Sequence, residues 1–254
     1  MHICAYTGSG IAMGLGAVGA AIGEGYTAAQ ANLAVSRNPE ISGDIFKNML
    51  VGQAVAESAS IFALVIAILL LFLDIPAVGH LKAAALFGAG ICMGFGAVGS
   101  GVGSGFPGGQ SCLGISRQPA AATRLTTNML IGSAVCQTPA IFSMVVALML
   151  IFMDFSNAPL HPTWAALLGA GLSTGLAAIG SGYGGGMAAG ASSEGIARQP
   201  ETVGNVTTIM LVGQAVAQTP SIFGLLVSFI LLFKSFPATE ALSAAMALLA
   251  AGLS

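Results

Sequence analysis

The sequence predicts an all-α membrane protein made of three tandem transmembrane helical hairpins, and two features carry this prediction. Of its 254 residues, 56% are hydrophobic and only 6% are charged, with a mean hydropathy of +0.91. A soluble domain of this size needs far more polar surface. The second feature is an internal repeat, because "LVGQAVAESASIF" at 50–62 returns as "LIGSAVCQTPAIF" at 130–142 and "LVGQAVAQTPSIF" at 211–223. One unit is therefore written three times.

Each unit has a first span rich in glycine and alanine and a second span rich in leucine, isoleucine, valine and phenylalanine. The predicted first spans are 3–36, 81–116 and 164–197, and the predicted second spans are 49–73, 129–153 and 210–233. Spans of these lengths can cross a hydrocarbon core of about 30 Å at about 1.5 Å per residue. Glycines let neighbouring helices approach closely. We therefore expect an inner circle of glycine-rich helices and an outer circle of bulky ones.

A short polar turn joins the two spans of each unit: "SRNPEISGD", "SRQPAAATR" and "ARQPETVGN". Proline lacks the N–H that a continuing helix needs and disfavours helix in the residue before it, so the chain folds back here. Five of the seven Lys and Arg residues lie at these turns, namely Arg37, Lys47, Arg117, Arg124 and Arg198. This bias favours turns on the cytoplasmic side of a cell membrane.

The repeat divides the chain into hairpin 1 at 1–79, hairpin 2 at 80–160 and hairpin 3 at 161–237. The apolar tail at 238–254 ends in "LLAAGLS", which matches "LLGAGLS" at 167–173. The tail therefore looks like a partial fourth repeat that could add a short C-terminal helix. The sequence leaves open whether this tail enters the membrane.

Hairpin 1 differs from the other two by carrying acidic residues in the middle of both spans. Glu57 lies in its second span, where hairpins 2 and 3 have Gln137 and Gln218. Glu24, in the first span, and Glu57 are each 13 residues from the turn, so both lie about 20 Å below it. A charged side chain at the bilayer centre costs on the order of 2.5 to 3.5 kcal/mol. The pair therefore indicates a functional site.

Two buried carboxylates at close range need a proton or a cation to neutralise them. Ser58 adds a hydroxyl oxygen next to Glu57, and oxygen ligands suit a hard cation such as Na⁺. Glutamine keeps the shape of glutamate without its titratable charge, so hairpins 2 and 3 are expected to keep the architecture without the ion. The structural alternative is a protonated Glu57 that donates a hydrogen bond between helices.

These residues resemble the c subunit, the membrane rotor or proteolipid, of F-type ATP synthases and ATPases. The resemblance rests on the glycine-rich first helix, the Arg-Gln/Asn-Pro turn and "GQAVAES" in the second helix. It implies a homo-oligomeric ring in the lipid bilayer of the inner membrane, turning against a stator a subunit that carries an arginine. The turns near Arg37, Arg117 and Arg198 would contact the central stalk of the catalytic head. The rotor itself would translocate ions and catalyse no reaction.

The resemblance also implies a ligand set. Sodium-binding members hold the ion with the second-helix Glu, an acid or amide on the first helix, a backbone carbonyl two residues before the Glu, and the hydroxyl after it. Matched onto this sequence, these ligands are Glu57, Glu24, the Val55 carbonyl and Ser58. That family takes the last two ligands from an adjacent hairpin. The alternative donors are therefore Val135 with Thr138, or Val216 with Thr219 of the next chain.

Several alternatives remain open at this point. Na⁺ is the expected coupling ion and H⁺ the alternative, because Ala59 and Phe62 stand where sodium rotors often carry threonine and tyrosine. A passive helical channel or a structural membrane assembly is the second alternative. "GLGAVG" at 14–19 lacks a preceding strand, so no organic cofactor is expected. A net charge of −2 without basic runs argues against a nucleic-acid partner.

Overall fold

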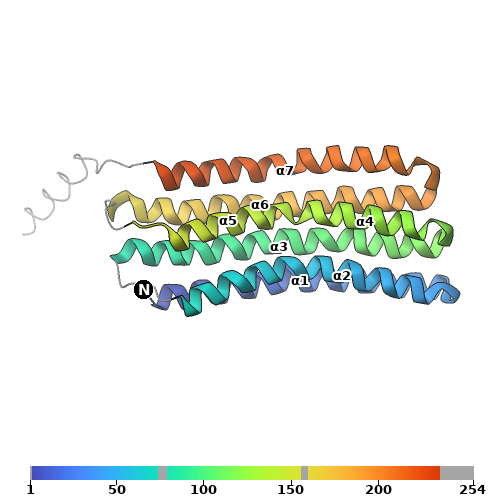
Figure 1. The fold of residues 1–254 in the computed structure, drawn as a ribbon, viewed down its shortest axis with the longest axis horizontal. Coiled ribbons are helices and arrows are strands. Elements are labelled where there is room, and N and C mark those ends of the chain that lie inside the picture. Colours follow the sequence, from blue (N-terminus) through green and yellow to red (C-terminus); the bar gives the residue numbers. More distant parts are fainter. Residues whose placement is uncertain (1, 74–78, 156–159, 235–254) are drawn as a thin grey trace, which may run out of the picture.

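The computed structural model describes residues 2–73, 79–155 and 160–234, which form long α-helices paired into three hairpins (Figure 1). The helices are α1 (His2–Arg37), α2 (Ser42–Phe72), α3 (Gly79–Arg117), α4 (Ala122–Cys136), α5 (Thr138–Phe152), α6 (Leu160–Arg198) and α7 (Val203–Phe233). Among the described residues, six helical stretches are long and apolar enough to span a membrane. The predicted all-α hairpin architecture is confirmed. The tail at 238–254 lies outside the described residues.

The three turns share one local geometry, which proline sets. The residue before each proline has an extended conformation that ends the first helix; Asn38, for example, has φ −143° and ψ 84°. This follows from the clash between the proline ring and a helical residue before it. The proline then opens a single turn of 3₁₀ helix, at Pro39–Ile41, Pro119–Ala121 and Pro200–Thr202. The chain therefore reverses within a few residues, as the sequence predicts.

The second helix of each hairpin begins earlier than its apolar span. Helix α2 starts at Ser42, whereas the apolar pattern starts at 49. The added turns carry polar residues, among them Asp44 in the first turn and the exposed Lys47. A carboxylate in the first turn interacts favourably with the helix dipole, so this polar stretch is helical too. Hydropathy alone marks only the part of the helix that can lie in hydrocarbon.

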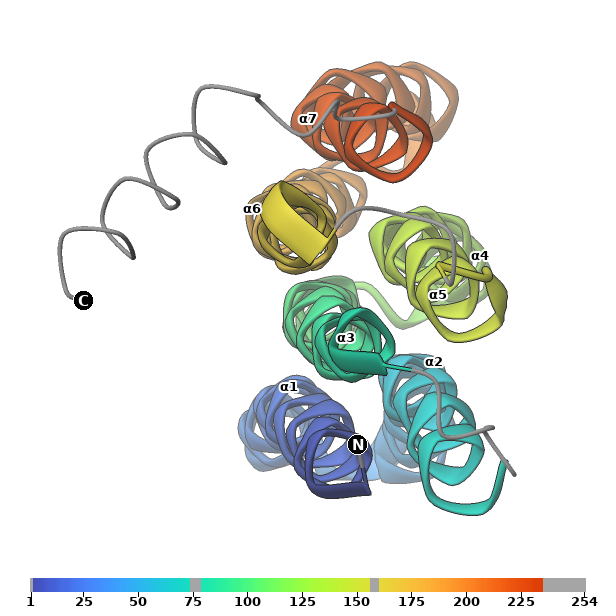
Figure 2. The ribbon, with the colours of Figure 1, turned by 90° about the vertical axis from the view of Figure 1, so that its left-hand side faces the viewer.

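The three hairpins stand side by side and form two arcs (Figure 2). The glycine-rich helices α1, α3 and α6 lie along the concave side, and α2, α4 with α5, and α7 lie along the convex side. Helix α3 packs against both α1 and α6, which makes hairpin 2 the middle one. The large exposed apolar side chains are most numerous on α2 and α7. The described hairpins thus form an arc with two open edges, one at hairpin 1 and one at hairpin 3.

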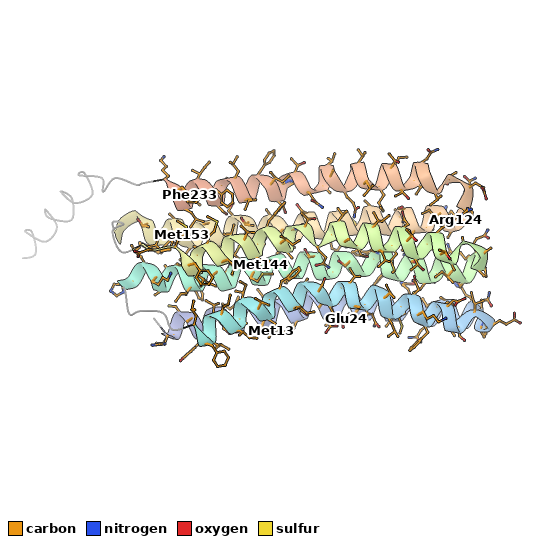
Figure 3. The ribbon with its side chains drawn as sticks, in the orientation of Figure 1. Met13, Glu24, Arg124, Met144, Met153 and Phe233 are labelled. Carbon is orange, nitrogen blue, oxygen red and sulfur yellow. The ribbon has the colours of Figure 1, made fainter. Side chains whose placement is uncertain are left out.

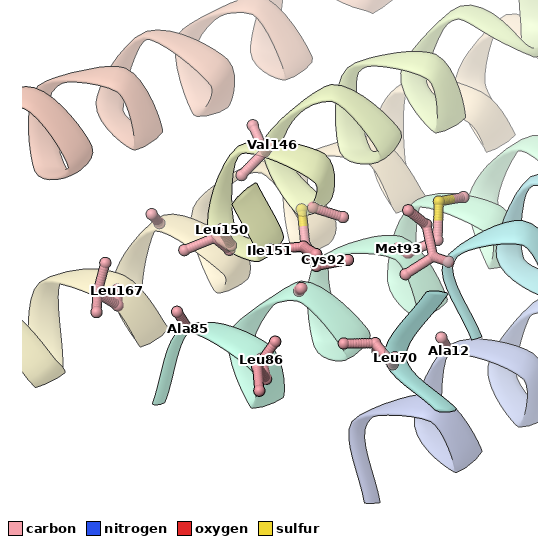
Figure 4. Close-up of a cluster of buried hydrophobic side chains, with 14 of the residues drawn as sticks. Ala12, Leu70, Ala85, Leu86, Cys92, Met93, Val146, Leu150, Ile151 and Leu167 are labelled. Atoms are coloured by element: carbon pink, nitrogen blue, oxygen red, sulfur yellow. The ribbon is translucent and has the colours of Figure 1, made fainter. Parts of the chain in front are cut away.

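Glycine lets the concave helices touch backbone to backbone. A Cβ atom added at Gly23 of α1 would collide with the carbonyl oxygen of Gly101 on α3, and one added at Gly103 would collide with that of Gly182 on α6. Such contacts need a residue without a side chain, and they hold membrane helices together by close van der Waals packing. Towards the end away from the turns, larger side chains fill the space between hairpins, including Leu70, Leu86, Met93 and Leu150 (Figure 4).

Two prolines each remove one backbone hydrogen-bond donor from the convex helices. The helix breaks at Gln137, between α4 and α5, two residues before Pro139. Pro220 instead lies inside α7, which is continuous through it. A break in the helix is therefore visible only at the first of the two prolines. At both places, however, the proline lacks the N–H that would bond to the carbonyl four residues earlier.

Candidate ion-binding site

A repeated hydrogen bond sets the level of the acid position in every hairpin. In hairpin 1, Gln53 Nε2 donates to the carbonyl oxygen of Glu24 at 3.3 Å. Gln53 lies one helical turn before Glu57, so this bond ties the two acid-bearing turns together. The equivalent bonds join Ser133 Oγ to the carbonyl of Ser104 at 3.3 Å and Gln214 Nε2 to that of Gly185 at 3.1 Å. The three hairpins therefore hold their two helices in the same register.

The two acids of hairpin 1 lie near each other. The hydrogen bond from Gln53 to the Glu24 carbonyl brings the turn of α1 that carries Glu24 to the level of the turn of α2 that carries Glu57. Glu24 lies near the middle of the length of the hairpin (Figure 3). Glu24 is half-buried and Glu57 is exposed in this single chain. The acid pair thus lies at an open edge of the arc rather than inside it.

The glutamines at the acid position reach the hairpin before their own. Gln137 Nε2 donates to the carbonyl oxygen of Val55 at 2.9 Å and to Ser104 Oγ at 2.7 Å. Gln218 Nε2 donates to the carbonyl oxygen of Val135 at 2.9 Å. In both cases the acceptor is the carbonyl two residues before the acid position of the preceding hairpin. An amide N–H therefore fills the place next to this carbonyl where a cation could bind.

The predicted ligands are divided between two places. The Val55 carbonyl accepts from Gln137 and also from Ser58 Oγ, at 2.6 Å. The predicted ligands Val55 and Ser58 therefore belong to the junction between hairpins 1 and 2. Glu57 faces away from that junction, because its counterpart Gln137 faces the preceding hairpin. Val216 is the valine of hairpin 3 that lies two residues before the acid position. It is 68% exposed at the opposite open edge of the chain. The nearby Thr219 Oγ1 donates to Ala215 of its own helix at 3.4 Å.

Two prolines free the carbonyls that face the acid position. Pro139 lies four residues after Val135, and Pro220 lies four residues after Val216. Because proline has no N–H, neither carbonyl oxygen receives the usual helical hydrogen bond. The Val135 carbonyl accepts from Gln218 Nε2 and from a backbone N–H at the end of α4. The spacing of four residues between valine and proline can be read from the sequence, and it points to a carbonyl available as a ligand.

Comparison with known proteins agrees with the repeated geometry. The family model for the ATP synthase C subunit matches three times, at residues 7–70, 87–150 and 168–231, which together make up most of the chain. The chain belongs to the ATP synthase C-subunit family. This c subunit is a multi-pass membrane protein and a non-catalytic rotor component of an ATP synthase membrane sector, with three tandem copies of the c-subunit unit.

Curated relatives match this c subunit over one hairpin-sized segment. The ATP synthase c subunit of Petrotoga mobilis is 48% identical over 65 residues, which is 26% of this chain and 68% of the relative. That of Natranaerobius thermophilus is 49% identical over 74 residues, 29% of this chain and 84% of the relative. That of Dehalococcoides mccartyi is 55% identical over 64 residues, 25% of this chain and 84% of the relative. Membership of this family implies a coupling ion.

Proposed function

We propose that this c subunit assembles into a homo-oligomeric ring that carries one Na⁺ per chain at Glu57 and turns against a stator a subunit bearing an arginine. The observation that carries the proposal is a single carboxylate pair at an open edge. At the two internal junctions the same position is closed by a glutamine that hydrogen-bonds to the preceding hairpin. Among the three described hairpins, none stands before hairpin 1 and the position of Glu57. Another copy of the chain would supply the preceding hairpin.

The glycines at the two open edges support assembly from copies of this chain. At the internal junctions, Gly90, Gly94 and Gly105 of α3 touch the backbone of α1. Their counterparts on the open edge of α1 are Gly10, Gly14 and Gly25, and a Cβ atom at any of them would meet nothing within 4 Å. The open edge of α6 matches this pattern, with Gly180 free of contacts and Gly184 nearly so. Edges related in this way pair head to tail, and such pairing can close into a ring.

The proposed site forms where hairpin 3 of one copy meets hairpin 1 of the next, a contact that we call the seam. By the repeat, Val216 of the neighbouring copy meets Glu57 as Val55 meets Gln137 within the chain. The Val216 carbonyl oxygen lacks a helical donor because of Pro220. With Glu24 and the Thr219 hydroxyl of the neighbouring copy, it offers Na⁺ a set of oxygen ligands.

Proton coupling is the alternative, because a protonated Glu57 could donate to the same Val216 carbonyl. Na⁺ is favoured by the second carboxylate. A second carboxylate, a carbonyl and a hydroxyl give several oxygen ligands, which suit a hard cation better than a proton that needs a single acceptor. With a proton on Glu24 and Na⁺ at Glu57, the site is also neutral. This state is the one that can return through lipid at low cost.

In the proposed cycle, Glu57 releases its ion when it meets the stator arginine and reloads from the other aqueous path. The arginine compensates the carboxylate while the ion is absent. The turns near Arg37, Arg117 and Arg198 would lie in the cytoplasm and contact the central stalk. With the Gln-bearing hairpins 2 and 3 carrying no ion, the ring moves one ion for every three hairpins that pass the stator.

The coupling ion can be tested by labelling Glu57 with a hydrophobic carbodiimide in the assembled ring, across a series of Na⁺ concentrations. Because the reagent attacks the protonated carboxyl, bound Na⁺ is expected to protect Glu57 at millimolar concentration, whereas K⁺ is not. The Glu57→Gln variant is the control and should lose the labelling that depends on Na⁺. Labelling that depends on pH and is insensitive to Na⁺ would assign the rotor to H⁺.

A further inference from the structure

We propose that an apolar pair, Phe46 of one copy and Ile209 of its neighbour, forms the contact at the seam. Both internal junctions use a buried asparagine at the equivalent position. The partner that fits each open edge is the opposite edge of a second copy. The proposal rests on the ring proposed above. It goes further by naming the residues that decide which hairpins meet across the seam.

The junction between hairpins 1 and 2 is held by Asn48, which is buried on α2. Its Oδ1 accepts from Thr126 Oγ1 of α4 at 2.8 Å and from Ser111 Oγ of α3 at 3.3 Å. Its Nδ2 donates to Cys112 Sγ at 3.3 Å. One amide of hairpin 1 therefore engages both helices of hairpin 2, and it does so near the turn end of the arc.

The junction between hairpins 2 and 3 repeats this arrangement around Asn128, which is also buried. Its Oδ1 accepts from Thr207 Oγ1 of α7 at 2.9 Å, the counterpart of Thr126. Its Nδ2 lies 2.9 Å from Ser192 Oγ and 3.4 Å from Ser193 Oγ, both on α6. A ring would have three hairpin junctions per chain, and two of them are thus closed by the same polar contact.

The third set of equivalent positions is apolar except for Asn32. Ile209 stands on α7 where the other hairpins have asparagine, and Phe46 stands on α2 where they have threonine. Ala31 takes the place of the serine. In the single chain Ile209 is 72% exposed and Phe46 is 56% exposed, one at each open edge. Asn32, at the place of Cys112, donates to Ala28 of its own helix at 3.1 Å, so its amide is already partnered.

The different chemistry discriminates between right and wrong neighbours. If hairpin 1 of one copy docked against Asn48 or Asn128 of another, Phe46 would face a buried amide and leave it without partners. An unpaired buried amide is strongly unfavourable. Specificity thus comes from a penalty on the wrong contacts as well as from the fit of Phe46 against Ile209.

The consequence for function is a fixed order of hairpins. Because the two internal junctions are closed within each chain, the seam joins hairpin 3 to hairpin 1 of the next copy, and the apolar pair recurs there once per chain. Val216 of one copy therefore always meets Glu57 of the next, and the ion sites fall at every third hairpin. A mispaired ring would bring Glu57 next to another carbonyl or two acid pairs next to each other.

Disulfide cross-linking tests the Phe46–Ile209 contact in the full chain. The F46C/I209C double variant should form inter-chain cross-links on oxidation and give a ladder of multimers on a denaturing gel. F46C alone should give none, because a head-to-tail seam keeps identical positions apart. When a chain with F46C is co-expressed with a chain with I209C, the product should stop at dimers. The internal pair N48C/T126C is the matched control and should give no inter-chain product.

The possible outcomes distinguish the Phe46–Ile209 contact from the ring. A ring seen by native mass spectrometry without F46C/I209C cross-links would overturn the proposed contact but not the ring. Cross-linking of F46C to itself would also overturn it, since that requires a two-fold contact. Absence of any oligomer would overturn both the ring and the Phe46–Ile209 contact.

A second experiment transplants the internal contact to the seam. I209N alone should make the ring dissociate more readily, by about tenfold, because it buries an amide against Phe46. F46T added to I209N should recover most of that loss, since the threonine can donate to the new asparagine as Thr126 donates to Asn48. If the losses of the two single variants simply add in the double variant, the two residues do not face each other and the proposal fails.

Discussion

At the scale of single residues, the exchange of one carboxylate for an amide separates hairpin 1, which we propose carries the ion, from the other two. Gln137 uses its N–H groups to hold the Val55 carbonyl and the Ser104 hydroxyl. A carboxylate at the same position has no such N–H to offer. It can engage the carbonyl only through a proton or a cation, which is the basis of the proposed site.

The variant Gln137→Glu should therefore create a second site within the chain. The new carboxylate would lie beside the Val55 carbonyl and the Ser104 hydroxyl, with Ser58 close by. We expect the Na⁺ bound per chain in the purified ring to rise from one to two. The second affinity should be lower, because Ser104 stands where hairpin 1 has Glu24. An assembled ring that binds no additional Na⁺ would show that an acid at this position is not sufficient.

At the scale of elements, the helices of each hairpin are positioned by features of two kinds. Proline turns and glycine faces are written in the sequence, so the six spans and the three hairpins could be predicted from it. The pairing of Gln137 with Val55 could not, because it depends on how each hairpin is rotated against its neighbour. For the same reason, sequence reasoning could not choose among Val55, Val135 and Val216 as the carbonyl near Glu57. The early start of α2 at Ser42 was missed because hydropathy records only its apolar part.

The proline in α7 gives a prediction about ion affinity. Pro220→Ala would restore the N–H that the Val216 carbonyl lacks, and the carbonyl would then be shared between a helical hydrogen bond and the ion. Na⁺ affinity of the ring should fall by up to about tenfold. It can be read from the Na⁺ concentration that half-protects Glu57 from carbodiimide. Pro139→Ala is the matched control, because Val135 faces Gln218 rather than Glu57. Equal effects of both variants would contradict the assignment.

The glycines of α1 give a prediction that separates folding from assembly. Gly23 packs on the backbone of Gly101 within the chain, whereas Gly25 is open. Gly23→Ala should lower the stability of the chain itself. Gly25→Ala should leave its helical content and stability unchanged and reduce the yield of rings on native gels, because its methyl group would lie in the seam. If the Gly25 variant formed rings as well as the unmodified protein, the open edge of α1 would not be a contact surface.

At the scale of the whole molecule, one ion site per three hairpins changes the gearing of the proposed rotor. Fewer ions per turn means fewer charges moved per ATP, and each charge costs about 2.3 kcal/mol per 100 mV. The same hydrolysis can therefore work against a steeper gradient. We expect the parent enzyme to pump ions by ATP hydrolysis far faster than it synthesises ATP at an ordinary membrane potential. Synthesis at rates that match hydrolysis would count against this gearing.

The most direct measurement is an experimental structure of the assembled protein in Na⁺, at a resolution that shows bound ions. The account predicts a closed ring with one ion per chain, held at the seam between Glu57 of one copy and the Val216 carbonyl of its neighbour. The positions of Gln137 and Gln218 should hold their amide hydrogen bonds and no ion. A solitary chain, or a ring in which Glu24 and Glu57 point away from each other with no density between Glu57 and Val216, would contradict it.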